Sequence, residues 1–177
     1  MESPTEPPTP SPFSLRVHSP GDMERITERH AQIYKQEYGW DEPFQKATAE
    51  VTSAFINHYD PAHERCWIAE RDAEFLGCVM LVKHHAYENT ARLRLLLVEP
   101  SARGLGVGRA LVRQCAQFAR EVGYARIRLW TTGVLASARH IYESEGYRMV
   151  REEELEAFGV RLVGQDWELV LYGSCGL

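Results

Sequence analysis

Long apolar runs are absent from the sequence, and its first residues combine neither a basic lead nor an apolar signal core. These absences argue against a membrane span and a secretory signal. Lysine and arginine do not cluster either, and the formal net charge of the 177 residues is −5. Nucleic-acid-binding proteins usually carry a basic patch, whereas an acidic protein attracts cations slightly better than anions. We therefore expect a cytoplasmic protein with no nucleic-acid and no membrane partner, and a weak preference for a cationic substrate.

Cysteine is also scarce, and none of the four cysteines stands in a C-x-x-C pair. At least two of them fall in apolar stretches, where a free thiol behaves as a small hydrophobic side chain. We expect reduced thiols and an intracellular protein. The four are Cys66, Cys78, Cys115 and Cys175.

The length is that of one domain, which buries roughly two thirds of the surface of its unfolded chain. The first 12 residues, Met1–Pro12, are nearly half proline and otherwise mostly Ser, Thr and Glu. Such a segment cannot bury apolar area. We expect a disordered proline-rich tail over residues 1–12 and a single domain over residues 13–177.

The most informative stretch contains a strand, a glycine-rich loop and a helix. Apolar residues run to Val98, and Pro100 then removes a hydrogen-bond donor, so a buried strand should end near Val98. The loop Arg103–Arg109 reads RGLGVGR, and its alternating glycines let backbone N–H groups approach a single anion. The helix that follows points its partially positive N-terminus at the same anion. Its buried stripe is Val107, Leu111, Cys115, Phe118 and Val122.

The spacing of the glycines separates the protein classes that use such a cradle. A nucleoside-triphosphate P-loop needs a lysine after its last glycine, and Arg109 follows Gly108 here. A dinucleotide fingerprint needs G-x-G-x-x-G and an acidic residue about 20 positions later, whereas here the pattern is G-x-G-x-G and the next strand ends in Trp130-Thr131-Thr132. A glycine-rich helix cap without a ligand stays open as an alternative.

The remaining elements follow from periodicity and turn residues. Ser19 and Pro20 are typical of a helix start, and Asp41 of a second one. Glu152, Glu153 and Glu154 should lie in a solvated loop or at a strand edge. The pattern predicts strands near 13–18, 66–69, 75–83, 93–98, 125–130, 147–150 and 165–171, and helices near 20–37, 42–59, 107–122 and 135–145.

This order, β-α-α-β-β-β-α-β-α-β-β, predicts an α/β fold with a mixed, largely antiparallel central sheet flanked by helices. The motif R-G-x-G-x-G after a V-E-P strand end resembles the pyrophosphate-binding motif of the GNAT superfamily of acyl-CoA N-acyltransferases, and the order of elements is also theirs. The resemblance runs over residues 13–172. It is greatest to the acetyltransferase half of MarR-GNAT fusion proteins, through Y-G-W-D, L-V-E-P-S-A-R-G-L-G-V-G, R-x-x-Y and L-V-G-Q-x-W-E-L. Too few residues precede the first strand for a winged helix, so no DNA-binding role is expected.

This resemblance implies a GNAT-like sheet with splayed central strands, and acetyl-CoA as co-substrate. In the family, a tyrosine protonates the departing CoA sulfur, and Tyr142 matches it; a phenol with an ordinary pKa near 10 can do this. Ala138, Ile141 and Tyr142 also form an apolar helix face, so packing stays the alternative. Leu135 stands where many members have an asparagine. The implied acetyl-CoA contacts are Leu96, Leu97, Val98, Arg103, Gly104, Leu105, Gly106, Val107, Gly108, Arg109 and Tyr142.

In the family the acceptor binds between the loop joining the first two helices and the last strands. The candidates to line this acceptor site are Tyr38, Trp40, Phe44 and Trp130. We expect transfer of the acetyl group to a primary amine of a small-molecule or amino-acid-like acceptor, by direct attack in a ternary complex. A non-catalytic acyl-CoA-binding or regulatory module, and a protein lysine or N-terminal acetyltransferase, are the alternatives. A homodimer stays open.

The general base is not evident. An alkylamine is almost wholly protonated at neutral pH, so a carboxylate, a histidine or a water chain must take its proton. Glu42, Glu99 and His84 lie on segments that can reach a cleft. His84 and His85 are adjacent and so point to opposite sides of a strand, and no carboxylate has ligand spacing, so we expect no metal.

Overall fold

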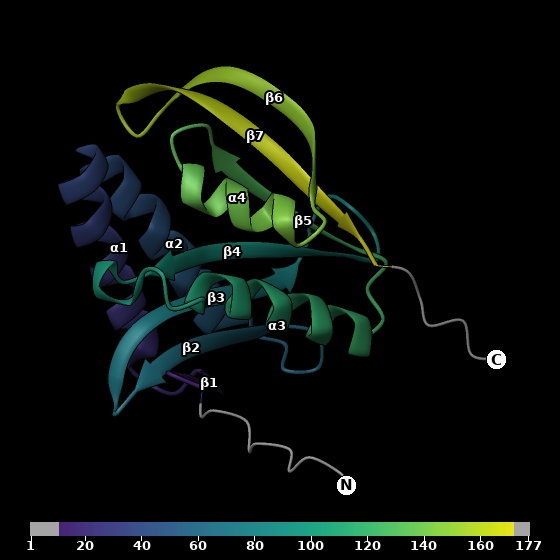
Figure 1. Cartoon of the computed structure of the whole chain (residues 1–177). Coiled ribbons are helices and arrows are strands. Elements are labelled where there is room, and N and C mark those ends of the chain that lie inside the picture. The colour runs from purple at the N-terminus through teal and green to yellow at the C-terminus, as the bar shows by residue number, and fades with distance from the viewer. Residues whose placement is uncertain (1–10, 172–177) are drawn as a thin grey trace, which may run out of the picture.

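The computed structural model describes residues 11–171, which form one seven-stranded sheet and four α-helices (Figure 1). Residues 1–10 of the expected tail, and Cys175, lie outside the described residues. The sheet order is β1-β2-β3-β4-β5-β7-β6, and the predicted order of elements and fold class are confirmed. The elements are β1 (Ser14–Val17), α1 (Asp22–Tyr38), α2 (Glu42–His58), β2 (Arg65–Arg71), β3 (Glu74–Lys83), β4 (Thr90–Val98), a short 3₁₀ turn η1 (Pro100–Ala102), α3 (Val107–Glu121), β5 (Arg126–Thr132), α4 (Ala136–Ser144), β6 (Arg148–Ala157) and β7 (Val160–Val170).

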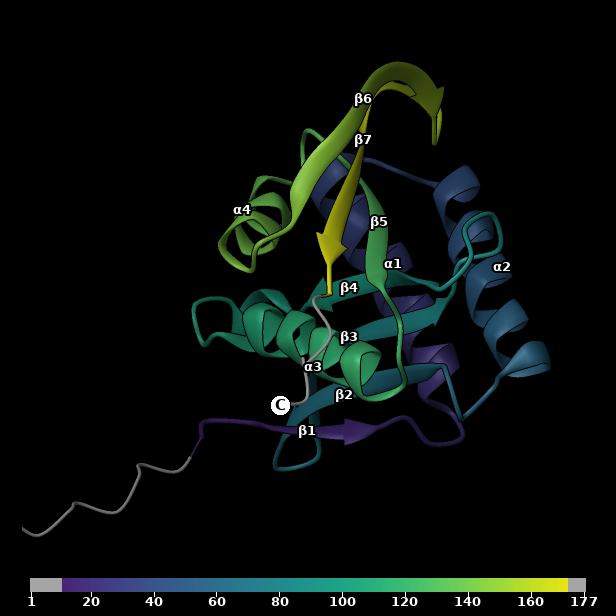
Figure 2. The same ribbon diagram turned by 90° about the vertical axis from the view of Figure 1, so that its right-hand side faces the viewer.

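The sheet separates two hydrophobic layers. Side chains alternate across a strand, so Val79 and Leu81 of β3 pack in the cluster that contains α3, whereas Cys78 and Met80 pack in the cluster that contains α1. Figure 2 shows α3 and α4 on one side of the sheet and α1 and α2 on the other. Burial on both faces explains why β3 reads as a nearly continuous apolar run. None of the helices within residues 11–171 is long and apolar enough to cross a membrane.

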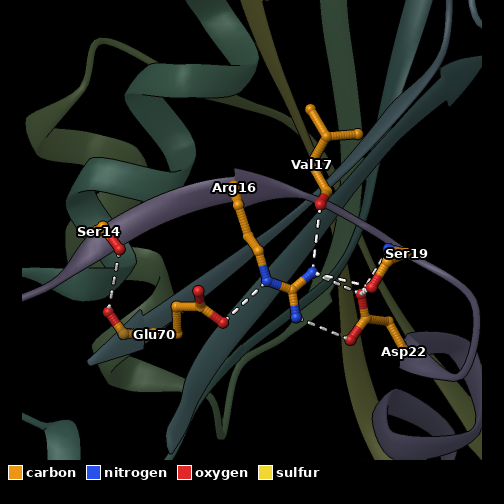
Figure 3. Close-up of polar contacts among 6 residues, drawn as sticks. All are labelled: Ser14, Arg16, Val17, Ser19, Asp22 and Glu70. Atoms are coloured by element: carbon orange, nitrogen blue, oxygen red, sulfur yellow. Dashed lines mark hydrogen bonds and ion pairs between the residues drawn. The ribbon is translucent and has the colours of Figure 1, made fainter. Parts of the chain in front are cut away.

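The start of α1 is held by an ion-pair network (Figure 3). Arg16 of β1 donates to the Asp22 carboxylate at 2.7 Å and to Glu70 of β2 at 2.8 Å. Burial by itself would raise the pKa of Asp22, but hydrogen bonds from Arg16 and Ser19 hold that pKa below its usual value. The helix begins at Asp22 with Gly21 as its N-cap, so the expected start, with Ser19 as N-cap and Pro20 as the first helical residue, is wrong by two residues. Ser19 instead donates its N–H to Asp22 at 2.6 Å.

Strand β4 contains a β-bulge. Two steps along β3, from Cys78 to Met80, lie opposite three steps along β4, from Leu97 to Arg94. The extra residue is accommodated at Leu95, whose φ of 54° is in the left-handed region that non-glycine residues rarely adopt. The bulge changes which side chains of β4 face each helical layer beyond this point.

Strands β4 and β5 separate before the bulge is reached. They pair in parallel through only three positions of β4, Thr90, Ala91 and Arg92. From there on β5 pairs only with β7, over its full length, and β4 pairs only with β3. The splayed central strands implied by the family resemblance are therefore present.

The last hairpin is longer than expected. β6 continues through Glu152, Glu153 and Glu154, which are exposed on the edge strand of the sheet. Of the two places expected for these glutamates, the strand edge is the right one, and charge at an exposed edge opposes pairing with another sheet. The turn uses Phe158 and Gly159, with φ of 54° and 75°. Phenylalanine is a poor turn residue by itself, so local sequence gives no signal for this turn.

We expect Gly77 to be required for the close approach of β3 to the bulged part of β4. A Cβ there would lie 2.5 Å from the backbone oxygen of Leu97, whereas a Cβ at Gly133 would have no neighbour closer than 3.6 Å. Gly77→Ala should lower the free energy of unfolding by about 2–3 kcal/mol, and Gly133→Ala by well under about 1 kcal/mol. Urea denaturation of the two variants checks this, and equal effects would contradict it.

Candidate active site

Two cavities adjoin where β4 and β5 separate. The first, the glycine-loop cleft, has a volume of about 780 Å³ and lies between the end of β4, the loop before α3, and α4. The second, the aromatic cavity, has a volume of about 170 Å³ and lies between α1, α2, β4, β5 and α4. Four residues line both cavities: Tyr34, Leu96, Leu135 and Ala138. A molecule in one cavity can therefore meet a molecule in the other.

The glycine loop presents unpaired backbone donors to the cleft. Gly104 and Gly106 have φ of 84° and 83°, and Gly106 is the N-cap of α3. The helix ladder starts with Ala110 N–H donating to the Gly106 carbonyl at 3.0 Å. The N–H groups of Val107, Gly108 and Arg109 precede that bond and have no acceptor in the helix. Together with the partially positive end of the helix dipole, these N–H groups are suited to bind an anion.

The two arginines of the loop are held on opposite sides of the cleft. Arg103 donates to Glu37 of α1 at 2.5 Å. Arg109 lies 3.4 Å from Glu145 and donates to Ser144 at 3.1 Å. Each thus forms an ion pair with a residue far away in the sequence, and both arginines also line the cleft. The side chain of Leu105 packs on the hydrophobic core and does not line the cleft.

The end of β4 contributes backbone to the cleft. Leu96, Leu97 and Val98 all line it. Since β5 pairs with β4 only as far as Arg92, the backbone groups of this segment that face β5 have no strand partner among residues 11–171. Free N–H groups at a cleft bind carbonyl or oxyanion groups.

Tyr142 of α4 is nearly buried, at 4% exposure, and lines the aromatic cavity one turn after Ala138, which lines both cavities. Its ring centroid is 5.7 Å from that of Tyr147 and 6.4 Å from that of Trp167. Burial raises the pKa of Tyr142 well above its ordinary value. The phenol is therefore protonated at any physiological pH. It is also part of the core, so packing and chemistry have to be separated by experiment.

Comparison with known proteins decides the family. The model of the Acetyltransferase (GNAT) family matches residues 27–147, more than half of the chain. The chain belongs to the GNAT acetyltransferase family. An uncharacterised N-acetyltransferase of Schizosaccharomyces pombe is 30% identical over 141 residues, which cover 78% of this chain and 85% of that protein.

One further relative by sequence and one solved structure are also similar to this chain. N-acetylaspartate synthetase of Danio rerio is 34% identical over 88 residues, half of this chain but only 31% of that protein. The yncA acetyltransferase of Salmonella typhimurium, solved with its cofactor acetyl-CoA, superimposes with a TM-score of 0.73 at 16% identity, over 93% of this chain and 97% of that one. This GNAT protein is an acyltransferase, as the sequence predicted.

Aromatic residues form much of the wall of the second cavity in this GNAT protein. Trp40 and Phe44 are nearly buried, and their rings lie 5.0 Å and 5.1 Å from that of Phe158 in the β6–β7 turn. Trp130 of β5 lines the same cavity. Tyr38 lines the glycine-loop cleft, and its ring centroid lies 5.3 Å from that of Trp40.

Two arginines of β4, which the sequence analysis passed over, also line the aromatic cavity. Among residues 11–171, neither Arg92 nor Arg94 forms an ion pair, and no Asp or Glu lines this cavity. Burial lowers the pKa of both guanidinium groups, and burial together with nearby Arg92 lowers that of Arg94 to about 10. The alternation of arginine and leucine in this strand is the signal that could have revealed them.

His30 of α1 is the second functional candidate that sequence reasoning missed, because it lies in the apolar stripe of its helix. Its Nδ1 lies 2.8 Å from the Ile26 carbonyl. A carbonyl only accepts, so Nδ1 carries the proton and Nε2 has a free lone pair. Nε2 has no hydrogen-bond partner among residues 11–171, and His30 lines the aromatic cavity. Burial lowers the pKa of His30 to about 4.

None of the three general bases considered from the sequence is a free side chain in the wall of either cavity. Both carboxylate oxygens of Glu99 accept hydrogen bonds from Arg29, at 2.6 and 2.7 Å, so Glu99 is not a free base. Glu42 and His84 line neither cavity. No cluster of three metal-ligating side chains occurs within residues 11–171.

We predict that His30 makes the fold sensitive to acid. Its pKa in the folded chain, about 4, is below the ordinary value of 6.5. As the pH falls from 6.5 to about 4, the unfolded chain takes up a proton at this histidine that the folded chain does not, so the folded state loses stability. His30→Asn keeps a donor for the Ile26 carbonyl and removes the imidazole. Between about pH 7.5 and about pH 4.5, the variant should lose roughly 2–3 kcal/mol less stability than the wild type.

Urea denaturation at the two pH values measures this difference. His58→Asn, at an exposed histidine of α2, is the control for the substitution itself. The same loss of stability in His30→Asn and the wild type would show that His30 does not resist protonation.

Proposed function

We propose that the protein transfers the acetyl group of acetyl-CoA to the primary amine of a small molecule bound in the aromatic cavity. The observation that carries this is the junction of the two cavities at the separated strands, lined by Tyr34, Leu96, Leu135 and Ala138. A thioester that reaches the junction from the glycine-loop cleft meets an amine that enters from the other face of the sheet. Direct attack in a ternary complex then needs no covalent enzyme intermediate.

The glycine-loop cleft fits acetyl-CoA. Its volume lies within the range of roughly 300–1,000 Å³ for ligand pockets. The N–H groups of Val107, Gly108 and Arg109 bind the pyrophosphate in this proposal. The pantetheine arm follows Leu96, Leu97 and Val98, whose free backbone groups offer it hydrogen bonds.

Three groups serve the transfer itself. Backbone N–H groups at the end of β4 stabilise the oxyanion that forms when the amine attacks the thioester carbonyl. The Nε2 atom of His30 accepts the proton that the amine must lose, directly or through a water. Tyr142 gives a proton to the thiolate as the C–S bond breaks. His30 is neutral at neutral pH because of its lowered pKa, so it is available as an acceptor.

The small volume of the aromatic cavity favours a small acceptor over a protein segment. The zebrafish relative is named N-acetylaspartate synthetase, which supports an amino-acid-like acceptor. The narrower resemblance to the acetyltransferase half of MarR-GNAT fusions belongs to this proposal, as does the cytoplasmic location. The buried free thiols of Cys66, Cys78 and Cys115 are consistent with a reducing compartment.

We predict that acetyl-CoA stabilises the fold through the glycine loop. At about 100 times its Kd, a ligand stabilises the folded state by roughly 2.7 kcal/mol. Gly106→Asp places a negative charge in the anion cradle and should abolish most of the rise in Tm. Gly123→Asp is the matched control, because Gly123 also has a positive φ and open space around it but lies beyond the other end of α3.

Differential scanning fluorimetry with millimolar acetyl-CoA measures both variants. An unchanged Tm in the wild type, or an equal shift in Gly106→Asp and Gly123→Asp, would remove acetyl-CoA from this loop.

We predict that Tyr142→Phe lowers turnover roughly 10²- to 10⁴-fold with little change in acetyl-CoA affinity, because it removes the proton and keeps the ring. Tyr147→Phe is the control: Tyr147 is equally buried beside it but lines neither cavity. Release of free CoA reports turnover, with chemistry shown to limit the rate. A Tyr142→Phe variant that keeps more than about a third of wild-type turnover assigns Tyr142 to packing alone.

A further inference from the structure

The acceptor side of the site contains two cationic side chains that have no counter-ion among residues 11–171. We infer that the acceptor is an amine that also carries a carboxylate, such as an amino acid or a small amino-acid conjugate, and that Arg92 and Arg94 bind this carboxylate. This inference rests on the proposed acetyl transfer, because it names the molecule that the aromatic cavity binds.

Strand geometry places both guanidinium groups in one cavity. Arg92 and Arg94 are two positions apart on β4, so their side chains leave the same face of the strand. That face is opposite to the one on which Ala91 and Leu93 pack with α3. Arg92 is the last residue of β4 that pairs with β5, so the two side chains lie where the sheet opens.

The same strand connects this pair to the acetyl-transfer junction. Arg94 precedes Leu96, which lines both cavities, by two residues. Two residues of strand span at most about 7 Å. Arg94 and the junction therefore belong to one short segment of β4, so a small molecule in the aromatic cavity can contact the Arg94 side chain and reach the junction with its amine.

The surrounding charges leave these two arginines available. Neighbouring Arg128 donates to Glu168 at 2.7 Å and lies over the Tyr87 ring, and Arg29 is bound to Glu99. The carboxylate of Asp166 partly opposes the lowering of the Arg92 pKa by burial, but the two side chains form no ion pair.

Among the described residues that line the aromatic cavity, Arg92 and Arg94 are the only charged ones, since His30 is neutral there at neutral pH. The cavity is therefore positive although the whole chain is negative. Partly buried guanidinium groups bind carboxylates strongly and with defined geometry. An amine without an anionic group brings only like charge into this cavity. The weak preference for a cationic substrate, drawn from the net charge, is thus reversed at the site itself.

The walls define the rest of the acceptor. The rings of Trp40, Phe44, Trp130 and Phe158 offer an apolar surface, and the volume of about 170 Å³ limits size. An amino acid with an apolar or aromatic side chain satisfies both features, and an acidic amino acid places its second carboxylate on the second arginine.

The test compares matched acceptors in a CoA-release assay: L-phenylalanine against L-phenylalaninamide and phenethylamine, and L-aspartate against L-aspartic diamide. The carboxylate-bearing member of each set should have a kcat/KM at least about 100-fold higher, since a site with polar groups left unpaired rejects the analogue that lacks the partner. Arg94→Gln should lower kcat/KM for the accepted amino acids at least about tenfold, mainly by raising their KM. The KM of acetyl-CoA should not change.

Two controls accompany Arg94→Gln. Arg71→Gln, at an exposed arginine of β2, should behave as the wild type. Without ligand, Arg94→Gln should have an equal or higher Tm, because it removes a partly buried charge that has no partner among residues 11–171. Should Arg94→Gln fail to fold, Arg92→Gln replaces it with the same expected outcome.

A binding measurement separates this inference from the proposed function. N-acetyl-L-phenylalanine, but not its amide, should raise the Tm of the wild type in the presence of CoA, and this rise should be lost in Arg94→Gln. Binding of this kind without turnover of any acceptor overturns the proposed transfer and supports the carboxylate site. Equal kcat/KM values for acids and amides would overturn the carboxylate site, and so would a KM and a ligand-induced Tm rise that are unchanged in Arg94→Gln. Either result is compatible with the proposed acetyl transfer.

Discussion

The site depends on the separation of β4 from β5 after only three paired residues. A continuous ladder would bury the end of β4 and close the passage between the two faces of the sheet. The separation is tolerable because each strand keeps a full partner on its other side, β3 for β4 and β7 for β5. The bulge at Leu95 then redirects the strand, so that Leu97 and Val98 reach the glycine loop while Arg92 and Arg94 remain on the acceptor side.

Seven buried side-chain atoms among residues 11–171 have no hydrogen-bond partner, and two of them, on His30 and Thr132, belong to residues that line the aromatic cavity. Asp22 and Glu99 each accept hydrogen bonds from an arginine. The Nε2 atom of His30 lacks a partner within residues 11–171, and neither Arg92 nor Arg94 forms an ion pair there. Unpaired buried groups destabilise a fold, so they persist where a ligand supplies the missing partner. In the aromatic cavity such an atom lies beside two arginines that form no ion pair within residues 11–171, so one ligand can partner both.

The net charge of the whole chain and the charge inside the aromatic cavity have opposite signs. The net charge of −5 belongs largely to exposed carboxylates, several of them on β6. The aromatic cavity is separated from them by protein of low dielectric constant, and its local field comes from two arginines. Composition therefore describes the molecule as seen from a distance, whereas substrate preference is set by the few charges that face the cavity.

The sequence alone determined the elements whose signals are local. The glycine loop, the strand end before it and the buried stripe of α3 are each encoded within a few residues, and they sufficed for the fold class and the family. Helix ends were less certain: Ser19 is a typical N-cap, but α1 begins after Gly21, and its first residue Asp22 is bound by Arg16 from β1.

Only the tertiary structure decided the identities of partners distant in sequence. Glu37 and Glu145 reach the loop arginines from other helices, Arg29 occupies Glu99, and Tyr38 and Trp40 line different cavities although they are two residues apart. The turn at Phe158 exists because its ring packs on Trp40 and Phe44, which outweighs the poor turn preference of phenylalanine. Periodicity reports which residues share a face, but ion pairs, cavities and desolvation depend on what the fold places against that face.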